Sequence, residues 1–347
     1  MKCYFKKYQL HFKKPSGTSR GVLHYKDTYI IIIEDKEQYA LGECNLFKGL
    51  SADEQPGYEQ KLQQVCDQIA EGKEPEFESL REWPSIVLGV ETVLKDHQNG
   101  CRKKIFASPF EEGKKLIPIN GLIWMGDKDD MLSQIREKLE EGFICLKMKI
   151  GAIDFDTELD ILKAVRKKYS ASEIELRVDA NGAWSKEEAI TNMEKLSKYH
   201  IHSIEQPIKA GDWNAMAALV RNSAIPIALD EELIGVFSKH EKIKLLQTIR
   251  PPYIILKPAL AGGFSGCDEW MNIADALGIK WWITSALESN IGLNAIAQYT
   301  SVKNNTLPQG LGTGKLFVNN FDSPLTITNG ALWYDESQGW NTKSLFK

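Results

Sequence analysis

The sequence predicts an α/β protein in which a β/α barrel carries a separate α+β domain. Three observations support this fold class. The chain has 347 residues, 43% hydrophobic and 26% charged, which is enough for a barrel and a smaller domain. From residue 117 onward, short β-branched runs alternate with amphipathic segments. Polar residues end several of these runs at intervals of about one strand-helix unit.

The first 115 residues are expected to form the α+β domain. Their apolar residues follow strand periodicity early and helical periodicity later, with a turn-rich stretch between the two. We predict strands over residues 2–12 and 28–34, a loop over 42–57, and helices over 58–71 and 84–98.

Residues 116–316 are expected to form the barrel. Eight candidate strands match the strand number of a closed β/α barrel, and amphipathic helices would connect them in parallel. The strands are predicted over residues 117–121, 143–150, 174–179, 202–205, 225–230, 253–257, 281–285 and 308–312. Connecting helices are predicted over segments that include 156–169, 185–199, 213–222 and 264–277.

The alternation of strands and helices stops after Thr313. Residues 317–347 contain Pro324, the turn dipeptide Asn329-Gly330 and short aromatic-rich runs. We expect this segment to return to the N-terminal domain.

Composition also bounds the partners. A net charge of −4 and a pI near 6.0 give no reason to expect a polyanion, so we expect no nucleic-acid partner. The apolar run at 29–33 is too short to cross a bilayer and the chain does not start like a signal peptide, so we expect a cytoplasmic protein with no membrane partner. Six cysteines without a C-x-x-C pair predict reduced thiols. The oligomeric state is left open.

Asp179, Glu205 and Asp230 end three successive predicted strands, at the end of a barrel where active sites form. A single carboxylate there is more often a helix cap or a surface ion pair. Three in register would repel one another unless a cation neutralises them. Because no histidine or cysteine accompanies them, we predict a hard ion, Mg²⁺, with an open coordination position.

Lys147 and Lys149 lie two residues apart on one predicted strand, so both should face the barrel interior. We expect their proximity to lower the pKa of at least one, which would let it take a proton from a carbon acid. Lys257 would approach from the far side of the pocket. The alternative is a solvated charge run, which the apolar neighbours at 144–146 disfavour.

Further polar residues lie near these strand ends. Arg177 shares the inward face of the first acidic residue, and Ser285 and Glu288 follow the seventh strand, where a substrate would lie. A purely structural role is equally expected for these three. Asn181 and Glu231 closely follow proposed ligands and are expected to orient them.

Five motifs follow one another along the barrel, namely Lys147-Met-Lys149, Asp179-Ala-Asn181-Gly-Ala-Trp184, Glu205-Gln-Pro207, Asp230-Glu231 and Leu256-Lys257-Pro258. Their order and spacing resemble the enolase superfamily, specifically its muconate lactonizing enzyme subgroup, and the likeness covers nearly the whole chain. It implies a modified (β/α)7β TIM-like barrel with an N-terminal α+β capping domain at 1–115, completed by the segment 317–347. It also implies metal-stabilised enolate chemistry.

Residues 42–51 and 284–292 look most like the o-succinylbenzoate synthases of that subgroup. This likeness implies the syn-dehydration of 2-succinyl-6-hydroxy-2,4-cyclohexadiene-1-carboxylate to 2-succinylbenzoate in menaquinone biosynthesis. Lys149 would be the base and Lys257 would stabilise the enediolate. Mg²⁺, with Mn²⁺ as a substitute, would bind the carboxylate of this small-molecule substrate. The capping loops around Phe47 and Ser51 are expected to close on it.

Other activities of the superfamily stay open as alternatives. Two lysines flanking an enediolate also suit an N-acylamino acid racemase or a dipeptide epimerase. Dipeptide epimerases usually carry Asp-x-Asp on the last barrel strand, whereas residues 310–314 here read Gly-Leu-Gly-Thr-Gly, which disfavours that activity. A non-catalytic barrel is the alternative from a different class, and the retained acids and lysines count against it.

Overall fold

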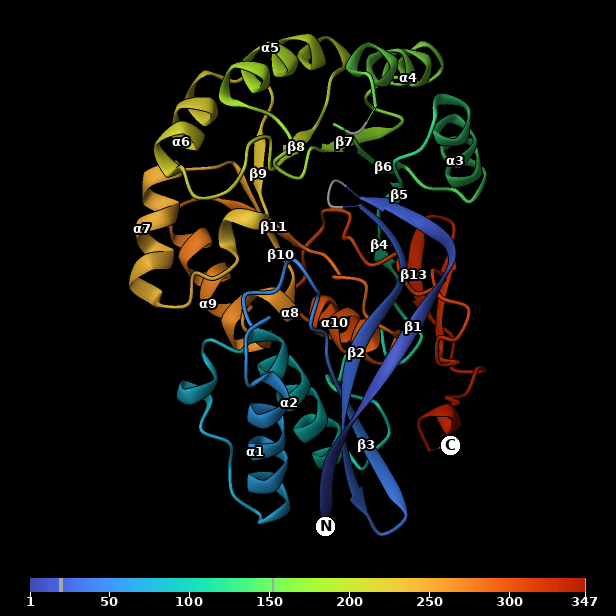
Figure 1. Ribbon diagram of the computed structural model, residues 1–347. Coiled ribbons are helices and arrows are strands. Elements are labelled where there is room, and N and C mark those ends of the chain that lie inside the picture. Colours follow the sequence, from blue (N-terminus) through green and yellow to red (C-terminus); the bar gives the residue numbers. More distant parts are fainter. Residues whose placement is uncertain (19–20, 152, 347) are drawn as a thin grey trace.

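The computed structural model is a β/α barrel with an antiparallel sheet and two helices attached at one side (Figure 1). It describes residues 1–18, 21–151 and 153–346. Seven parallel strands follow one another in chain order around the barrel, which confirms the predicted fold class. They are β5 (Gly121–Ile123), β6 (Cys145–Lys149), β7 (Glu175–Asp179), β8 (Ser203–Glu205), β9 (Ile227–Leu229), β10 (Tyr253–Leu256) and β11 (Lys280–Ile283).

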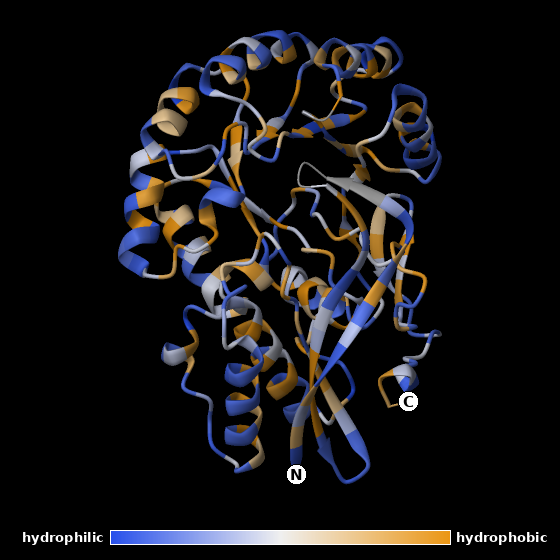
Figure 2. Cartoon of the chain, in the orientation of Figure 1, coloured by the Kyte–Doolittle hydropathy of each residue, from blue (hydrophilic) through white to orange (hydrophobic). Residues whose placement is uncertain are grey.

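Helices surround these strands, and the four helical segments predicted above are confirmed within a few residues. Serines begin α5 and α7 with capping boxes, in which Glu188 and Glu241 bond back to the chain. Figure 2 shows hydrophobic residues on the strands and on the helix faces turned toward them. The barrel helices are α3 (Lys128–Glu140), α4 (Phe155–Lys168), α5 (Lys186–Leu196), α6 (Trp213–Asn222), α7 (Lys239–Ile249), α8 (Pro258–Ala261), α9 (Gly263–Ala276) and α10 (Asn290–Ser301), with short 3-10 turns η2 (Ser197–Tyr199) and η3 (Glu231–Leu233).

The eighth predicted strand closes the barrel but is not a regular strand. Gln309 N donates to Pro118 O (2.9 Å) and Gly310 N donates to Ile283 O (2.8 Å), so isolated pairs join the segment to the residues just before β5 and to the end of β11. Pro308 has no N–H to give to a ladder, and the glycines that follow it are poor strand formers. These residues explain why the expected strand is reduced to a seam, that is, to isolated backbone bridges on each side.

The first predicted strand, at 117–121, divides between two sheets. The barrel strand proper begins at Gly121, while β4 (Ile117–Pro118) pairs with β13 (Ala331–Tyr334). β13 in turn forms a hairpin with β12 (Leu325–Thr328) across the Asn329-Gly330 turn. The C-terminal segment therefore packs directly on the start of the barrel.

The N-terminal unit holds the antiparallel strands β1 (Lys2–Thr18), β2 (Gly21–Asp35) and β3 (Gln38–Cys44), the helices α1 (Tyr58–Ala70) and α2 (Pro84–Gln98), and the turn η1 (Phe77–Leu80). Both predicted helices are confirmed. The predicted loop at 42–57 is wrong at its start, because β3 continues to Cys44. Gly42 lies so close to Gly89 of α2 that a Cβ there would meet the Gly89 carbonyl at 2.0 Å. This glycine marks close strand-helix packing and not a turn.

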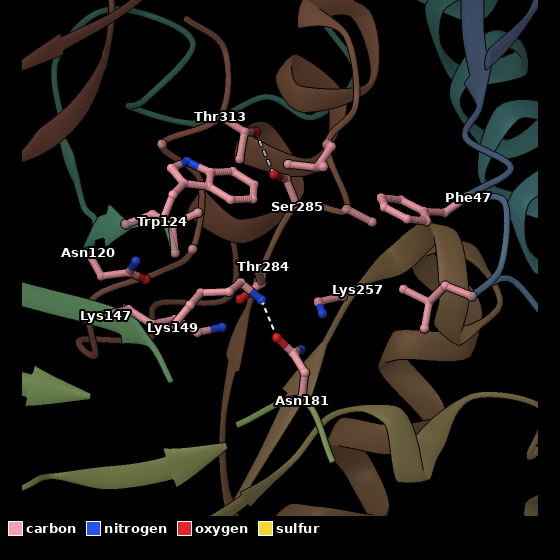
Figure 3. Close-up of a pocket in the computed structure, with 16 residues that line it drawn as sticks. Phe47, Asn120, Trp124, Lys147, Lys149, Asn181, Lys257, Thr284, Ser285 and Thr313 are labelled. Carbon is pink, nitrogen blue, oxygen red and sulfur yellow. Dashed lines mark hydrogen bonds between the residues drawn. The ribbon is translucent and has the colours of Figure 1, made fainter. Parts of the chain in front are cut away.

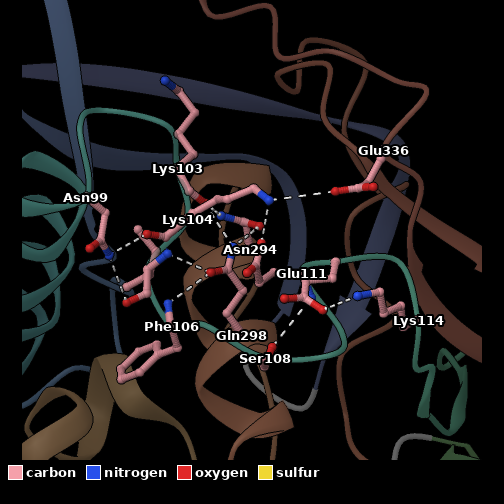
Figure 4. A network of polar contacts seen from close by, with 12 residues as sticks. Asn99, Lys103, Lys104, Phe106, Ser108, Glu111, Lys114, Asn294, Gln298 and Glu336 are labelled. Carbon is pink, nitrogen blue, oxygen red and sulfur yellow. Dashed lines mark hydrogen bonds and ion pairs between the residues drawn. The ribbon is translucent and has the colours of Figure 1, made fainter.

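The crossing from the N-terminal unit to the barrel is fixed by amide side chains of α10 (Figure 4). Gln298 Oε1 accepts from Ile105 N (2.6 Å) and Phe106 N (3.1 Å). Gln298 Nε2 and Asn294 Nδ2 both donate to Lys103 O, at 2.9 and 2.8 Å. One barrel helix thus supplies the hydrogen bonds that this irregular segment lacks internally.

The end of the chain also touches its beginning. Val318 N donates to His11 O (2.9 Å) and Tyr8 Oη donates to Asn319 O (2.8 Å). The last turn, η4 (Lys343–Phe346), lies against β1 and β3. In Figure 1 the long β1–β2 hairpin extends from this unit up to the barrel.

All six cysteines are free thiols, as predicted. Within the described ranges, none of the helices combines the length and apolar character needed to cross a membrane.

Asp53 supplies the cap that α2 lacks at its own N-terminus. Its buried Oδ2 accepts from Ser85 N (2.9 Å) and Ser85 Oγ (2.6 Å). We expect Asp53→Ala to lower the free energy of unfolding by about 1–3 kcal/mol, because it leaves buried donors without an acceptor. Urea denaturation measures the loss. The control Glu78→Gln removes only an exposed pair with Arg81 and should cost less than about 1 kcal/mol; equal losses would contradict the capping role.

Candidate active site

The three acidic residues predicted as metal ligands meet at one end of the barrel. Asp179 ends β7, Glu205 ends β8 and pairs with it in register, and Asp230 directly follows β9. None is more than 2% exposed. Parallel strands in register bring their carboxyl ends together, which is why residues 26 and 25 positions apart in the chain become neighbours.

Two lysines pair with these acids. Lys147 Nζ lies 2.9 Å from Asp179 Oδ2 and also forms an ion pair with Glu205. Lys257, which directly follows β10, forms an ion pair with Asp230 at the end of the neighbouring strand β9. Buried carboxylates are tolerable only when such partners compensate their lost hydration.

Lys149 lies nearer the open end of the site. Its Nζ is 3.0 Å from Asp179 Oδ2 and donates to Asn181 Oδ1 at 2.7 Å. Asn181 N donates to Asp179 Oδ1 (3.0 Å), and Asn181 Nδ2 donates to Glu231 Oε1 (2.9 Å). Asn181 therefore links Asp179, Lys149 and Glu231 through hydrogen bonds, and the orientation of metal ligands by Asn181 and Glu231 stays a prediction.

The sequence analysis expected that the proximity of two lysines would lower the pKa of at least one of them, and the structure shows a different balance of charges. Burial disfavours the ammonium of Lys147, but the carboxylates of Asp179, Glu205 and Asp230 outweigh it and raise the pKa of Lys147. Burial likewise opposes the charge of Lys257, and nearby carboxylates raise its pKa. The prediction of a lowered pKa is therefore wrong for Lys147, because the three carboxylates around it favour its charged form.

The same surroundings shift the pKa values of Glu205 and Asp179 in opposite directions. Burial raises the pKa of Glu205, and the negative charge of Asp179 raises it further, while Lys147 opposes both. For Asp179 burial acts in the same direction, but Lys147 and Lys149 overcome it and lower its pKa. Lysine therefore compensates the charge of Glu205 less than that of Asp179.

The donor set fits a hard divalent cation. As placed, the acids face lysines, and no three acidic, histidine or cysteine side chains of the described residues already form a metal cage. Yet Glu205 Oε1 is buried and accepts no hydrogen bond among the described residues. A buried carboxylate oxygen without a donor, beside two further carboxylates, is the arrangement in which Asp179, Glu205 and Asp230 could hold Mg²⁺.

A cavity of about 90 Å³ opens above this cluster (Figure 3). Lys147 and Lys149 enter it from β6, and Lys257 enters from the opposite side. Its remaining walls come from the barrel and from the loop after β3. They are formed by Phe47, Leu50, Asn120, Leu122, Trp124, Asn181, Thr284, Ser285, Ala286, Leu287, Gly310, Gly312 and Thr313.

Of the predicted substrate contacts, Phe47 and Ser285 line the cavity. Ser51 does not, but its Oγ accepts from Phe47 N (2.8 Å) and so holds that ring in place. Glu288 is fully buried behind the wall and accepts from Asn45 Nδ2 (2.9 Å). The expectation that Glu288 contacts substrate is therefore replaced by a supporting position.

Arg177 also lies away from the cavity. Its Nε donates to Glu175 Oε1 (2.7 Å) and its Nη1 donates to Pro308 O (2.9 Å), toward the amino end of the strands. The guanidinium lies 4.3 Å from the centre of the Trp282 ring. An inward-facing residue can point into a lower layer of the barrel, which is what overturns the expected substrate contact.

Several cavity residues were missed by the sequence analysis. Asn120 lies in the first predicted strand, and Thr284 directly follows the seventh, so both carry the strand-end polar signal that identified the acids. Thr313, whose Oγ1 is 2.6 Å from Ser285 Oγ, follows the glycine-rich seam. Trp124 and Leu287 have no such signal, because apolar residues after a strand are common in any barrel.

These features define a class of barrel enzymes. A family profile described as "Enolase C-terminal domain-like" matches residues 130–342, more than half of the chain. The chain belongs to this enolase superfamily, as its motifs predicted.

Individual relatives narrow the comparison. The chain is 44% identical to the o-succinylbenzoate synthase of Desulfotalea psychrophila, over 96% of this chain and 98% of that protein. The crystal structure of MenC from Desulfotalea psychrophila LSv54 matches with a TM-score of 0.85 and 39% identity, covering 96% of this chain and 99% of that one. A dipeptide epimerase from Enterococcus faecalis V583, complexed with Mg and a dipeptide, matches with a TM-score of 0.78 over 96% of each chain; at 19% identity it shows the fold alone.

Glu205→Gln tests the cation site apart from any reaction. The neutral amide removes repulsion from Asp179, so we expect the variant without divalent metal to melt at or above the wild-type temperature. Added Mg²⁺ should raise the melting temperature of the wild type, by mass action, and not that of Glu205→Gln. Thermal unfolding with EDTA and with Mg²⁺ measures both effects. The exposed control Glu194→Gln should keep the Mg²⁺ response, and an equal response in Glu205→Gln would remove Glu205 from the site.

Proposed function

We propose that the chain is an o-succinylbenzoate synthase, which converts 2-succinyl-6-hydroxy-2,4-cyclohexadiene-1-carboxylate to 2-succinylbenzoate and water in menaquinone biosynthesis. The observation that carries the proposal is the placement of Lys149 and Lys257 on opposite sides of one cavity, above three buried carboxylates. The near full-length relative with this activity supports it. Residues 1–115 as capping domain, 116–316 as catalytic barrel and 317–347 as returning segment belong to the proposal, as does a cytoplasmic location.

Lys149 carries out both proton transfers of the proposed elimination. Lys149 Nζ removes the proton from C1 of the ring, and the electron pair moves into the carboxylate to give an enediolate. The pair then returns to form the C1–C6 double bond while the C6–O bond breaks. Lys149, protonated in the first step and on the same face, returns the proton so that the hydroxyl leaves as water.

Electrostatic stabilisation is the larger demand, because the enediolate carries two negative oxygens. Lys257, whose pKa is raised by Asp230 and its neighbours against the effect of burial, stays cationic and opposes that charge. Lys147 stays cationic for the same reason and keeps the acids in place. When bound by Asp179, Glu205 and Asp230, Mg²⁺, with Mn²⁺ as a substitute, would supply a further positive charge opposite the substrate carboxylate.

Racemisation of N-acylamino acids is the second candidate, because two lysines on opposite faces of an enediolate can exchange its proton. Dipeptide epimerisation is disfavoured, since residues 310–314 place glycines and Thr313 on the cavity where an acidic pair would be needed for an ammonium group. Purified protein should be given the cyclohexadiene substrate and, separately, N-succinylamino acids. Ultraviolet absorbance follows aromatisation and optical rotation follows racemisation. Racemisation without dehydration would overturn the proposal.

Lys149→Ala should abolish dehydration while leaving Mg²⁺ and 2-succinylbenzoate binding largely intact, because it removes a group needed in the transition state. We expect a loss of at least about 10³-fold in kcat from removing the positioned base. Rapid-mix absorbance assays measure kcat, and calorimetric titration measures binding. The exposed control Lys195→Ala should behave as wild type. Turnover near the wild-type rate in Lys149→Ala would remove it as the base.

A further inference from the structure

A strained turn follows the seventh barrel strand. Residues 285–289 connect β11 to α10, and Leu287 in their middle has a φ of 63°. This left-handed conformation is unfavourable for a residue with a Cβ. Leu287 nevertheless lines the cavity and packs in one apolar cluster with Phe47. A leucine kept in a strained backbone at a cavity wall points to a role for its side chain.

The turn is held by a buried polar cluster reaching from the N-terminal unit, the turn clamp, formed by Lys26, Asn45 and Glu288. Asn45 Nδ2 donates to Ala286 O (2.8 Å) and to Glu288 Oε1 (2.9 Å), and Lys26 Nζ donates to Asn45 Oδ1. Glu288 Oε2 accepts from Ala286 N (2.7 Å). The residues on both sides of Leu287 are therefore fixed by hydrogen bonds from which water is excluded.

The chemistry of the clamp is specific to a carboxylate at position 288. Both oxygens of Glu288 accept an N–H, which an amide of the same shape cannot do with its one oxygen. Burial and, next, the charge of Glu43 raise the pKa of Glu288 to about 7, although Lys26 opposes both. Glu43 accepts from Ser289 N (3.0 Å) and Gly292 N (2.9 Å), so the same sheet also anchors the start of α10.

We propose that Leu287 is a specificity-determining residue that forms an apolar wall against the ring of the substrate, and that Asn45 and Glu288 are positioning residues that hold it there. The inference rests on the proposed dehydration. A six-membered ring carboxylate offers a face that packs against the apolar surface formed by Leu287 and Phe47. An N-succinylamino acid with a small side chain, such as N-succinylalanine, has no such face and gains little from the wall.

Leu287→Ala and Leu287→Gly test the wall. Each should raise KM for the cyclohexadiene carboxylate at least about tenfold, since lost apolar contact in a pocket commonly costs that much, with kcat changed far less because no lysine moves. KM for N-succinylalanine, wherever turnover is measurable, should stay within about threefold, below the effect of one methylene. Leu287→Gly should melt at a higher temperature than Leu287→Ala, because glycine relieves the strained φ. An unchanged KM for the ring substrate in both variants would overturn the role of Leu287.

Exchanging the clamp residues tests their positioning role. Glu288→Gln and Asn45→Asp should each raise KM more than they lower kcat. In the double variant Asn45→Asp/Glu288→Gln, the amide at 288 can donate to the carboxylate at 45 while its oxygen still accepts from Ala286 N, and Lys26 keeps an acceptor. Ala286 O still loses the donor that Asn45 supplied. We therefore expect KM to recover part of the way from the single-variant values toward the wild-type value. A double variant no better than the single ones would overturn the clamp.

A matched control separates positioning from general stability. Asn294→Asp is the same isosteric change in another contact between these units, where Asn294 donates to Lys103 O (Figure 4). It should lower the melting temperature without changing KM; a KM change as large as that of Asn45→Asp would overturn the positioning role. If the wild type does not dehydrate the ring substrate, the proposed function is wrong, and so is the role of Leu287 as a wall against that ring. A wild type that does dehydrate it, with KM unaffected in the Leu287 variants, defeats this inference alone.

Discussion

Mutual repulsion among three buried carboxylates is the constraint on which the rest of this structure depends. Asp179 and Glu205 lie side by side on paired strands and Asp230 follows the next one, out of contact with bulk water. In such surroundings each charge must be compensated locally. Lys147, Lys149 and Lys257 do so, and their placement explains the use of charged residues on β6 and after β10, where barrel packing alone would favour apolar ones.

The cavity above this cluster is shaped by two bodies of the chain. The barrel supplies the chemistry, while Phe47 and the clamp residue Asn45 come from the loop after β3. Polar contacts join these bodies at the start of α10 and along its first turns. A wall assembled across such a junction can change its shape through one side without disturbing the acids on the other, which is consistent with one scaffold serving several reactions.

Much of this was predictable because it follows from local periodicity and strand-end residues. The barrel strands, the acids and the lysines all have signals within a few neighbouring positions. The predictions that failed concern residues whose contact partners are distant in the sequence. Gly42 looks like a turn residue until Gly89 is placed against it, Arg177 and Glu288 are polar residues whose direction is set by Glu175 and Asn45, and Leu287 becomes visible only through its φ angle. The balance of charge between the lysines and the acids was likewise not predictable, because it depends on the distances between them.

The pairing of the two chain ends has a consequence for how the protein is made. His11 and Tyr8 of the first strand bond to residues 318 and 319, and β4 pairs with β13. During synthesis the first strand therefore leaves the ribosome long before residues 318 and 319 exist. The barrel can form while the outer edge of that strand is still unpaired. Every described residue that lines the cavity precedes residue 314. A chain cut short after residue 314 would therefore keep the acids, the lysines and the cavity wall, but β4 would have no partner strand and the outer edge of β1 would be left uncovered.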